Sequence, residues 1–167
     1  VSLFARTEKG ISLFAVDTNV PGFKVGPPEK KMGIKGSVTN PLSFENVRIP
    51  KENLIGTDGR GFIYAMKTLD AGRLGLGAAC MGVSKELLEL STKYAKERVQ
   101  FDHPISHFQA IQFMLSDMAV KVDAAKLLTI RAAALKDANK KYFKEAAMAK
   151  LYASKIAVEC ALDAIQI

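Results

Sequence analysis

The stretch that decides the fold is residues 62–94, FIYAMKTLDAGRLGLGAACMGVSKELLELSTKY, in which apolar side chains recur every three or four residues. The stripe consists of Phe62, Met66, Leu69, Leu76, Cys80, Val83, Leu87, Leu90 and Tyr94, and it is interrupted by Arg73. This spacing is typical of a helix that packs one face against partners in a bundle. Thirty-odd residues at a rise of 1.5 Å predict a rod of roughly 50 Å.

Two further helical stripes follow the first one. They cover residues 108–132 and 146–167, and helix-breaking residues separate the three stripes at 102–104 and 137–139. Long helices joined by short connections predict an up-down bundle, and bundles of this type usually contain four helices. We therefore expect three of the four helices within this sequence.

The N-terminal part of the chain has a different character. Residues 1–16 and 42–49 contain short runs of β-forming residues with partial alternation, and Pro-Gly and Pro-Pro pairs between them mark turns. The sequence predicts an α+β protein, with an antiparallel β-domain portion over residues 1–55 and a truncated helical bundle over residues 56–167. Because the chain starts within a strand and stops within a helix, we expect it to be part of a larger protein.

Composition excludes several classes of function. The 167 residues include 24 basic and 17 acidic side chains, a net charge of +7. The longest run without a polar residue, at 74–83, is about half as long as a membrane span requires, so we expect no membrane insertion. The basic residues lack the aromatic interleaving of nucleic-acid-binding proteins. The two cysteines are far apart and predict free thiols, and the two histidines flank Pro104, which argues against a metal site.

A few polar residues stand where a functional interpretation competes with a structural one. Arg73 occupies the apolar stripe with Asp70 one turn earlier, so the two side chains form either an ion pair at the bundle edge or part of a polar site. Arg98 and Phe101 close the first helix, where the arginine either complements the helix dipole or holds a phosphate beside a stacking ring. No nucleophile–base pair and no pair of carboxylates is evident.

In their order along the chain, these residues and the segments around them resemble the acyl-CoA dehydrogenases, most closely the short-chain (butyryl-CoA) type. The segments that carry the resemblance are Val20–Gly26, Lys31–Ser37, Phe44–Pro50, Gly61–Met66, Leu69–Arg73, Glu97–Phe101, Gln109–Phe113, Glu145–Lys150 and Ala164–Ile167. The resemblance implies an N-terminal helical domain, a middle β-domain and a C-terminal four-helix bundle, of which this chain would hold the end of the second and most of the third.

The resemblance also implies FAD as the cofactor, bound between the β-domain and the bundle. Arg98 and Phe101 would form the family's R-x-x-F motif, with Gln100 between them, and would contact FAD across a subunit interface. Gln109 would contact the dinucleotide from the same neighbouring subunit. Gln166 would be the cofactor-binding glutamine that precedes a Gly-Gly pair in the family.

On the substrate side, the resemblance implies that Asp70 and Arg73 contact the acyl-CoA, and Leu69 is a candidate for setting the acyl-chain length. The family reaction removes the substrate α-proton with a glutamate base and moves the β-hydride to the flavin. A minority of members carry this base where Gly72 stands here, so we expect the catalytic glutamate beyond Ile167 and no catalytic residue within the chain.

The family passes electrons to electron-transfer flavoprotein and forms homodimers or homotetramers, in the bacterial cytoplasm or the mitochondrial matrix. Asp102 departs from the family, which usually has glycine after the R-x-x-F motif, although aspartate tolerates turn conformations. Two alternatives stay open. One is a non-catalytic helical module that associates through its apolar stripes, and the other is a related acyl-CoA oxidase of the same fold.

Overall fold

The computed structural model describes all of residues 1–167, which form two compact units, Val1–Met66 and Lys67–Ile167. The boundary between the units falls inside the first helix, α1 (Gly61–Glu97). Antiparallel strands make up the first unit and helices dominate the second, so the predicted α+β class is confirmed. None of the helices combines the length and the hydropathy needed to cross a membrane.

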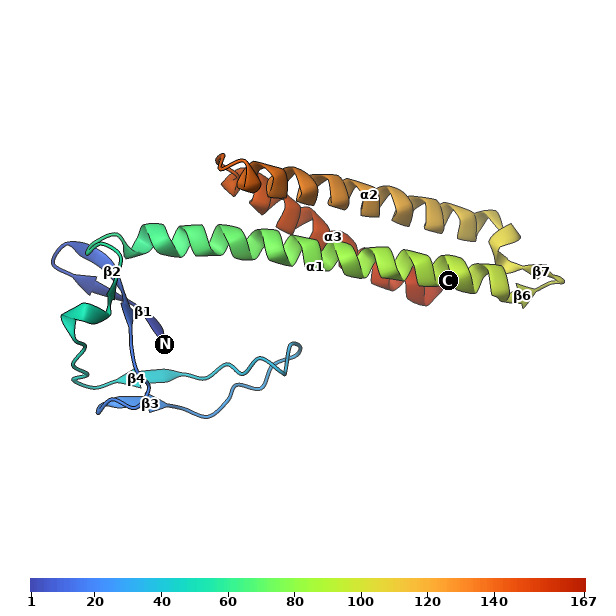
Figure 1. Ribbon diagram of the computed structural model, residues 1–167. Coiled ribbons are helices and arrows are strands. Elements are labelled where there is room, and N and C mark those ends of the chain that lie inside the picture. Colours follow the sequence, from blue (N-terminus) through green and yellow to red (C-terminus); the bar gives the residue numbers. More distant parts are fainter. The chain divides into compact units, whose positions relative to one another are not determined.

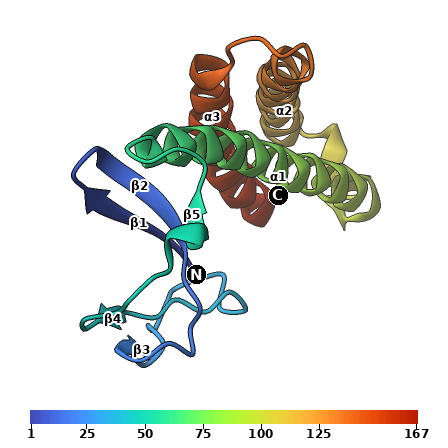
Figure 2. The same cartoon turned by 60° about the vertical axis from the view of Figure 1, so that its left-hand side comes forward.

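The first unit contains a three-stranded antiparallel sheet in the order β1-β2-β5 (Figure 2). Strands β1 (Ser2–Thr7) and β2 (Gly10–Ala15) form a tight hairpin, and β5 (Leu54–Ile55) pairs with the other edge of β2. Gly10 closes the hairpin with a φ of 127°, a conformation that favours glycine. The expectation of short antiparallel strands in this region is confirmed.

A second pair of strands joins β3 (Phe23–Val25) to β4 (Leu42–Phe44), and the rings of Phe23 and Phe44 meet edge to face at 5.1 Å. The predicted strand over 42–49 is wrong beyond Phe44. Asn46 adopts a φ of 49°, which breaks the extended conformation, and a short 3₁₀ turn, η1 (Lys51–Asn53), follows.

One carboxylate ties the first hairpin to the segment ahead of α1. Asp58 Oδ1 accepts hydrogen bonds from Ser12 Oγ at 2.5 Å and Thr7 Oγ1 at 2.8 Å, and Gly59 N–H donates to Ser12 Oγ at 2.6 Å. Ser12 is fully buried. These bonds, first the one from Ser12, lower the pKa of Asp58, and the nearby Lys9 ammonium adds to the effect. The carboxylate therefore stays ionised, as this brace requires.

The second unit is an up-down arrangement of α1, α2 (Gln109–Asp137) and α3 (Phe143–Gln166) (Figure 1). Between α1 and α2 the chain makes a two-residue antiparallel pair, β6 (Val99–Gln100) with β7 (His103–Pro104), and a 3₁₀ turn, η2 (Ile105–His107). The helix positions expected from the three stripes are confirmed.

The core of the bundle confirms the predicted inner faces of α2 and α3. The buried residues are Met118, Val122, Ala125, Thr129 and Ala132 on α2, and Ala146, Ala149, Ala153, Ile156 and Cys160 on α3. On α1 the predicted stripe is confirmed in part, because Cys80 and Leu87 pack against the core. It is wrong at Leu69, Leu76, Val83 and Leu90, which are about half exposed. Neighbouring positions of α1 take their place in the core, and the residues there that are buried or pack against it are Leu74, Gly77, Met81, Ser84, Leu88, Ser91 and Ala95.

The reason for this shift is the size of the side chains on α1. A Cβ added to Gly77 would lie 3.3 Å from the carbonyl carbon of Ala149, so α3 approaches α1 at the level of the backbone. Small residues allow this approach, and the larger apolar residues then stand on a neighbouring face. Gly72, Gly75 and Gly82 have nothing within 4 Å of an added Cβ and do not serve this contact.

Candidate functional site

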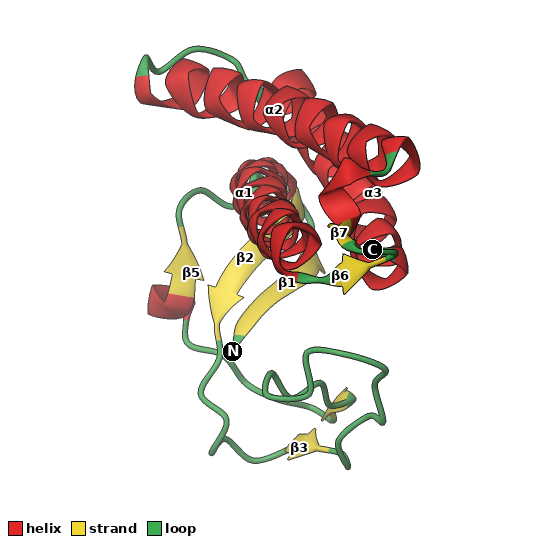
Figure 3. Ribbon diagram, turned by 90° about the vertical axis from the view of Figure 1, so that its right-hand side faces the viewer, coloured by secondary structure: helices red, strands yellow, loops and turns green.

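The direction of the helices gathers the cofactor residues suggested by the sequence at one end of the bundle. Because α1 and α3 run the same way and α2 runs back, the last turns of α1 and α3 lie beside the start of α2 (Figures 1 and 3). We call this the motif end, which comprises Arg98, Gln100, Phe101, Gln109 and Gln166. The substrate residues suggested by the sequence lie near the opposite end of the bundle unit.

The turn between β6 and β7 projects an aromatic ring into solvent. Phe101 and Asp102 have φ values of 52° and 65°, two consecutive non-glycine residues in the left-handed region. Each such residue costs about 1 kcal/mol or more relative to an unstrained backbone. The Phe101 ring is 84% exposed, and its one ring contact is an edge-to-face approach to Phe108 at 6.2 Å. The turn therefore tolerates aspartate in place of glycine, as the sequence predicted.

Arg98 has an anchored backbone and a free head group. Its N–H donates to the Tyr94 carbonyl at 2.9 Å, and its carbonyl accepts from Ile105 N–H at 2.8 Å. The guanidinium makes no ion pair within the chain. A planar cation of this kind can hold a phosphate with two parallel hydrogen bonds.

Gln100 and Gln109 add exposed amide groups to the same end. Gln100 lies opposite His103 in the β6–β7 pair, and Gln109 is the first residue of α2. A flavin dinucleotide offers a pyrophosphate, ring faces and hydrogen-bonding groups at its ring edges. A free guanidinium, an exposed aromatic ring and amides without other partners can contact these three parts in turn. The residues present therefore fit FAD.

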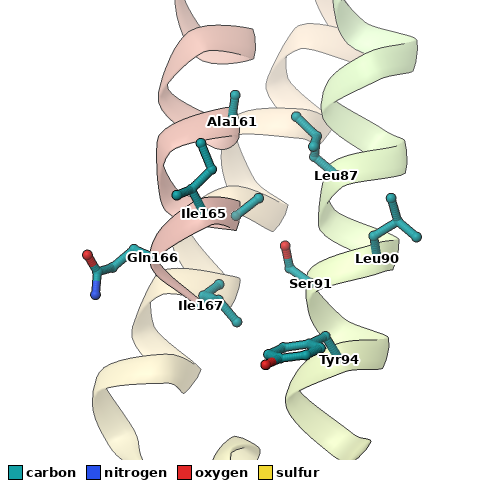
Figure 4. Close-up of a pocket in the computed structure, with 9 residues that line it drawn as sticks. Leu87, Leu90, Ser91, Tyr94, Ala161, Ile165, Gln166 and Ile167 are labelled. Carbon is teal, nitrogen blue, oxygen red and sulfur yellow. The ribbon is translucent and has the colours of Figure 1, made fainter. Parts of the chain in front are cut away.

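Gln166 ends α3 next to a hollow of about 550 Å³ between α1 and α3. The residues that line the hollow are Leu87, Leu90, Ser91 and Tyr94 of α1 and Ala161, Ala164, Ile165, Gln166 and Ile167 of α3. Figure 4 shows the Gln166 amide directed away from the α1 side of the hollow. The amide is thus available to a group outside the three-helix core.

Near the start of α1, Arg73 Nη1 donates to Asp70 Oδ1 at 2.7 Å, so the predicted pairing is confirmed. Arg73 keeps 41% of its side chain exposed and Asp70 only 19%. The next residue, Leu74, is buried against Ala132 of α2 and fixes this turn of α1 to the bundle. Asp70 therefore orients a guanidinium whose other donors remain free, and Leu69 is half exposed one residue before the pair.

The structure also contains features that the sequence interpretation missed. Lys121 of α2 bridges Glu159 and Asp163 of α3. The signal in the sequence was Asp163, a carboxylate within the third apolar stripe that requires a partner of opposite charge. His103 and His107 stack with ring centroids 5.3 Å apart. The chain contains no group of three or more histidine, cysteine or carboxylate side chains that could hold a metal ion.

The chain has clear relatives among known proteins. Residues 59–167 match the family model described as acyl-CoA dehydrogenase, C-terminal domain. The mitochondrial short-chain specific acyl-CoA dehydrogenase of Rattus norvegicus is 48% identical over 98% of this chain and 40% of its own length. A subunit of the caffeyl-CoA reductase–Etf complex of Acetobacterium woodii is 48% identical over 99% of this chain and 45% of its own length.

The solved structure of butyryl-CoA dehydrogenase from Megasphaera elsdenii superposes with a TM-score of 0.91 at 40% identity, over 99% of this chain and 44% of that one. The chain therefore spans less than half the length of the relatives it matches.

Proposed function

Because the chain belongs to the acyl-CoA dehydrogenase family, we propose that it is part of an FAD-dependent enzyme that acts on the Cα–Cβ bond of a short-chain acyl-CoA thioester. The proposal assigns the strands of residues 1–55 to the end of a middle β-domain and residues 56–167 to a C-terminal bundle. Identity of 48% to a short-chain dehydrogenase over nearly the whole chain supports the substrate class.

The observation that carries the proposal is the turn at Arg98–Asp102. Two consecutive left-handed residues hold an aromatic ring in solvent beside an unpaired guanidinium. A two-residue hairpin loop requires positive φ at both of its residues, so the β6–β7 pair fixes this backbone and presents the ring beside the guanidinium. In the proposed enzyme, Arg98 binds the FAD pyrophosphate through paired hydrogen bonds, and Phe101 stacks against a ring of the cofactor.

The amides at the motif end complete the cofactor site. Gln100, Gln109 and Gln166 donate and accept hydrogen bonds at the polar edges of the dinucleotide, which orients it with respect to the bundle. Bound FAD supplies the flavin ring that exchanges a hydride with the substrate β-carbon.

The Asp70–Arg73 pair binds the substrate in this proposal. Asp70 occupies one donor of the guanidinium at 2.7 Å and fixes its orientation, while the remaining donors face the acyl-CoA. Acyl-CoA carries phosphates, so a positive charge at this point attracts it. Leu69 lies half exposed beside the pair and would contact the acyl part of the substrate.

The names of the relatives describe both a dehydrogenase and a reductase of CoA thioesters. The relatives include dehydrogenases and a subunit of a caffeyl-CoA reductase–Etf complex. We propose the oxidative direction with electron-transfer flavoprotein as acceptor. Reduction of an enoyl-CoA in an Etf complex is the second candidate, which the 48% identity to the Acetobacterium woodii protein favours. Reoxidation of the flavin by oxygen would instead indicate the oxidase alternative.

Association of several copies is also part of the proposal. Apolar side chains without partners lie along α2 (Phe113, Val120 and Leu127) and α3 (Leu151, Val158 and Leu162), each more than 60% exposed. Apolar faces of this extent favour coverage, by the expected fourth helix of the bundle and by another copy of the protein. We propose a homodimer or homotetramer, in a bacterial cytoplasm or a mitochondrial matrix, and light scattering of the full-length protein measures the copy number.

The test uses the full-length protein and its Arg98→Gln variant, with Lys136→Gln as a control that removes an exposed, unpaired positive charge from the last turn of α2. We expect the wild type to bind one FAD per chain and butyryl-CoA to bleach its visible absorbance. Loss of a charged hydrogen bond predicts an increase of about tenfold or more in the Kd for FAD in Arg98→Gln and no change in the control. A wild-type protein that binds no FAD, or one that butyryl-CoA does not bleach, would overturn the proposed function.

A further inference from the structure

Two histidine rings stack against each other beside the turn at the motif end. The imidazoles of His103 and His107 have ring centroids 5.3 Å apart and planes 10° from parallel. Both residues are exposed, and neither forms an ion pair with a carboxylate of the chain. The proposed function gives no role to either ring.

The register of the β6–β7 pair places His103 on the face that carries Arg98. Gln100 lies directly opposite His103, and side chains opposite each other in an antiparallel pair point to the same face. Arg98 precedes Gln100 by two residues, and its carbonyl accepts the Ile105 N–H at 2.8 Å, so the same register continues beyond the strand. Alternation along the strand then puts Arg98 on that face as well. Arg98 and His103 are diagonal neighbours, a relation that brings Cβ atoms to roughly 7 Å from each other.

Few charged groups surround the His103 ring. Besides the stacked imidazole, the charged side chains near it along the chain are Arg98 on the same face, Asp102 in the turn and Lys96–Glu97 at the end of α1. Helix α2 packs against the turn η2 and has no charged side chain before Asp117. Histidine is the side chain that ordinarily changes its charge between about pH 5 and pH 8. A proton on His103 would add a positive charge beside Arg98 and offset the negative charge of Asp102.

We propose that His103 is a further binding residue for the pyrophosphate of FAD, which it contacts in its protonated form beside Arg98. The identity of the ligand rests on the proposed function. Each phosphate of the dinucleotide carries a negative charge, and a guanidinium and an imidazolium on one face can hold both. The stacked ring of His107 holds the His103 ring in one orientation, which lowers the entropy that binding costs. The affinity for FAD therefore increases as the pH falls.

The test is the Kd for FAD of the full-length protein at about pH 8 and about pH 5.5. Both phosphates of FAD stay ionised over this range, and any histidine outside this sequence contributes equally to wild type and variants. We expect the wild type to bind FAD about tenfold more tightly at the lower pH, because a charged hydrogen bond is gained. His103→Lys keeps its charge at both pH values and should bind FAD at the higher pH about as tightly as the wild type does at the lower one.

His103→Phe and His107→Phe form a matched pair, because each keeps an aromatic stack and removes one imidazole. We expect His103→Phe to lose the pH-dependent gain in affinity and His107→Phe to retain it. If either variant does not fold, the two glutamine variants at these positions give the same comparison.

A wild type whose Kd does not change with pH, or two phenylalanine variants that respond to pH alike, would overturn the role of His103 and leave FAD binding through Arg98 intact. A wild type that binds no FAD at either pH would overturn the proposed function and this inference together.

Discussion

Replacement of Gly77 by alanine tests the backbone contact between α1 and α3. A Cβ at this position would lie 3.3 Å from the carbonyl carbon of Ala149 and from the amide nitrogen of Lys150, and 3.4 Å from the Ala149 oxygen. Alanine favours a helix over glycine by about 1 kcal/mol, whereas overpacking costs about 1–3 kcal/mol. We therefore expect Gly77→Ala to lower the free energy of unfolding by about 1 kcal/mol.

Gly75 and Gly82 provide matched controls on the same helix. Neither has an atom within 4 Å of an added Cβ, so alanine gains the propensity without the overpacking. We expect Gly75→Ala and Gly82→Ala to raise the free energy of unfolding by about 0.5–1 kcal/mol. Urea unfolding followed by circular dichroism measures all three variants. If Gly77→Ala stabilises the protein as much as the controls do, the close approach of α3 to α1 is refuted.

Two further predictions concern single carboxylates. The pKa of Asp58 is lowered, so its hydrogen bonds with Ser12 and Thr7 stabilise the fold at pH values above the ordinary carboxyl pKa of 3.8. This contribution is lost as the pH falls through the lowered pKa. Asp58→Asn should thus lower the thermal midpoint at neutral pH and differ less from the wild type in acid; an equal difference at every pH would contradict this. Asp102→Gly should relieve strain at a φ of 65° and raise the free energy of unfolding by about 0.5–1 kcal/mol, and a decrease in urea unfolding would argue against strain at this turn.

The sequence pattern was sufficient to predict the positions of the helices, because a stripe of constant period over many residues is little affected by any single exception. It located α2 and α3 and their buried faces correctly. On α1 it was correct for Cys80 and Leu87 but wrong for Leu69, Leu76, Val83 and Leu90, because the pattern selects large apolar side chains and passes over the small residues that face the core. Leu76 is exposed while Gly77 faces α3, because the close approach of the two backbones requires a small residue at the contact. A pattern of hydrophobicity alone does not reveal such a contact.

The candidate site was predictable where neighbours in sequence are neighbours in space. The Asp70–Arg73 pair follows from helical spacing, and the structure confirms it. Contacts between distant segments were not predictable in this way. The bridge from Lys121 to Asp163 depends on how α2 and α3 align, and no local pattern specifies that alignment.

The length of α1 constrains how the two candidate sites can cooperate. Arg73 and Arg98 are 25 residues apart on and just beyond one continuous helix, which corresponds to roughly 37 Å along its axis. A rigid helix cannot bring these two guanidinium groups to the same reacting atoms. We therefore propose that one copy of the chain contributes Arg73 to one reaction centre and Arg98 to the cofactor of another copy, which is the shared arrangement that the family resemblance implies.

Mixed oligomers test this arrangement. Arg73→Gln and Arg98→Gln should each impair the full-length enzyme, because each removes a contact from every centre. In a mixed dimer, one centre receives both substitutions and the other receives neither. Random reassembly of the two variants should then restore about a quarter of the wild-type activity, since half of the dimers are mixed and each mixed dimer has one intact centre. If both arginines served the centre of their own chain, every centre would keep one substitution and mixing would restore nothing.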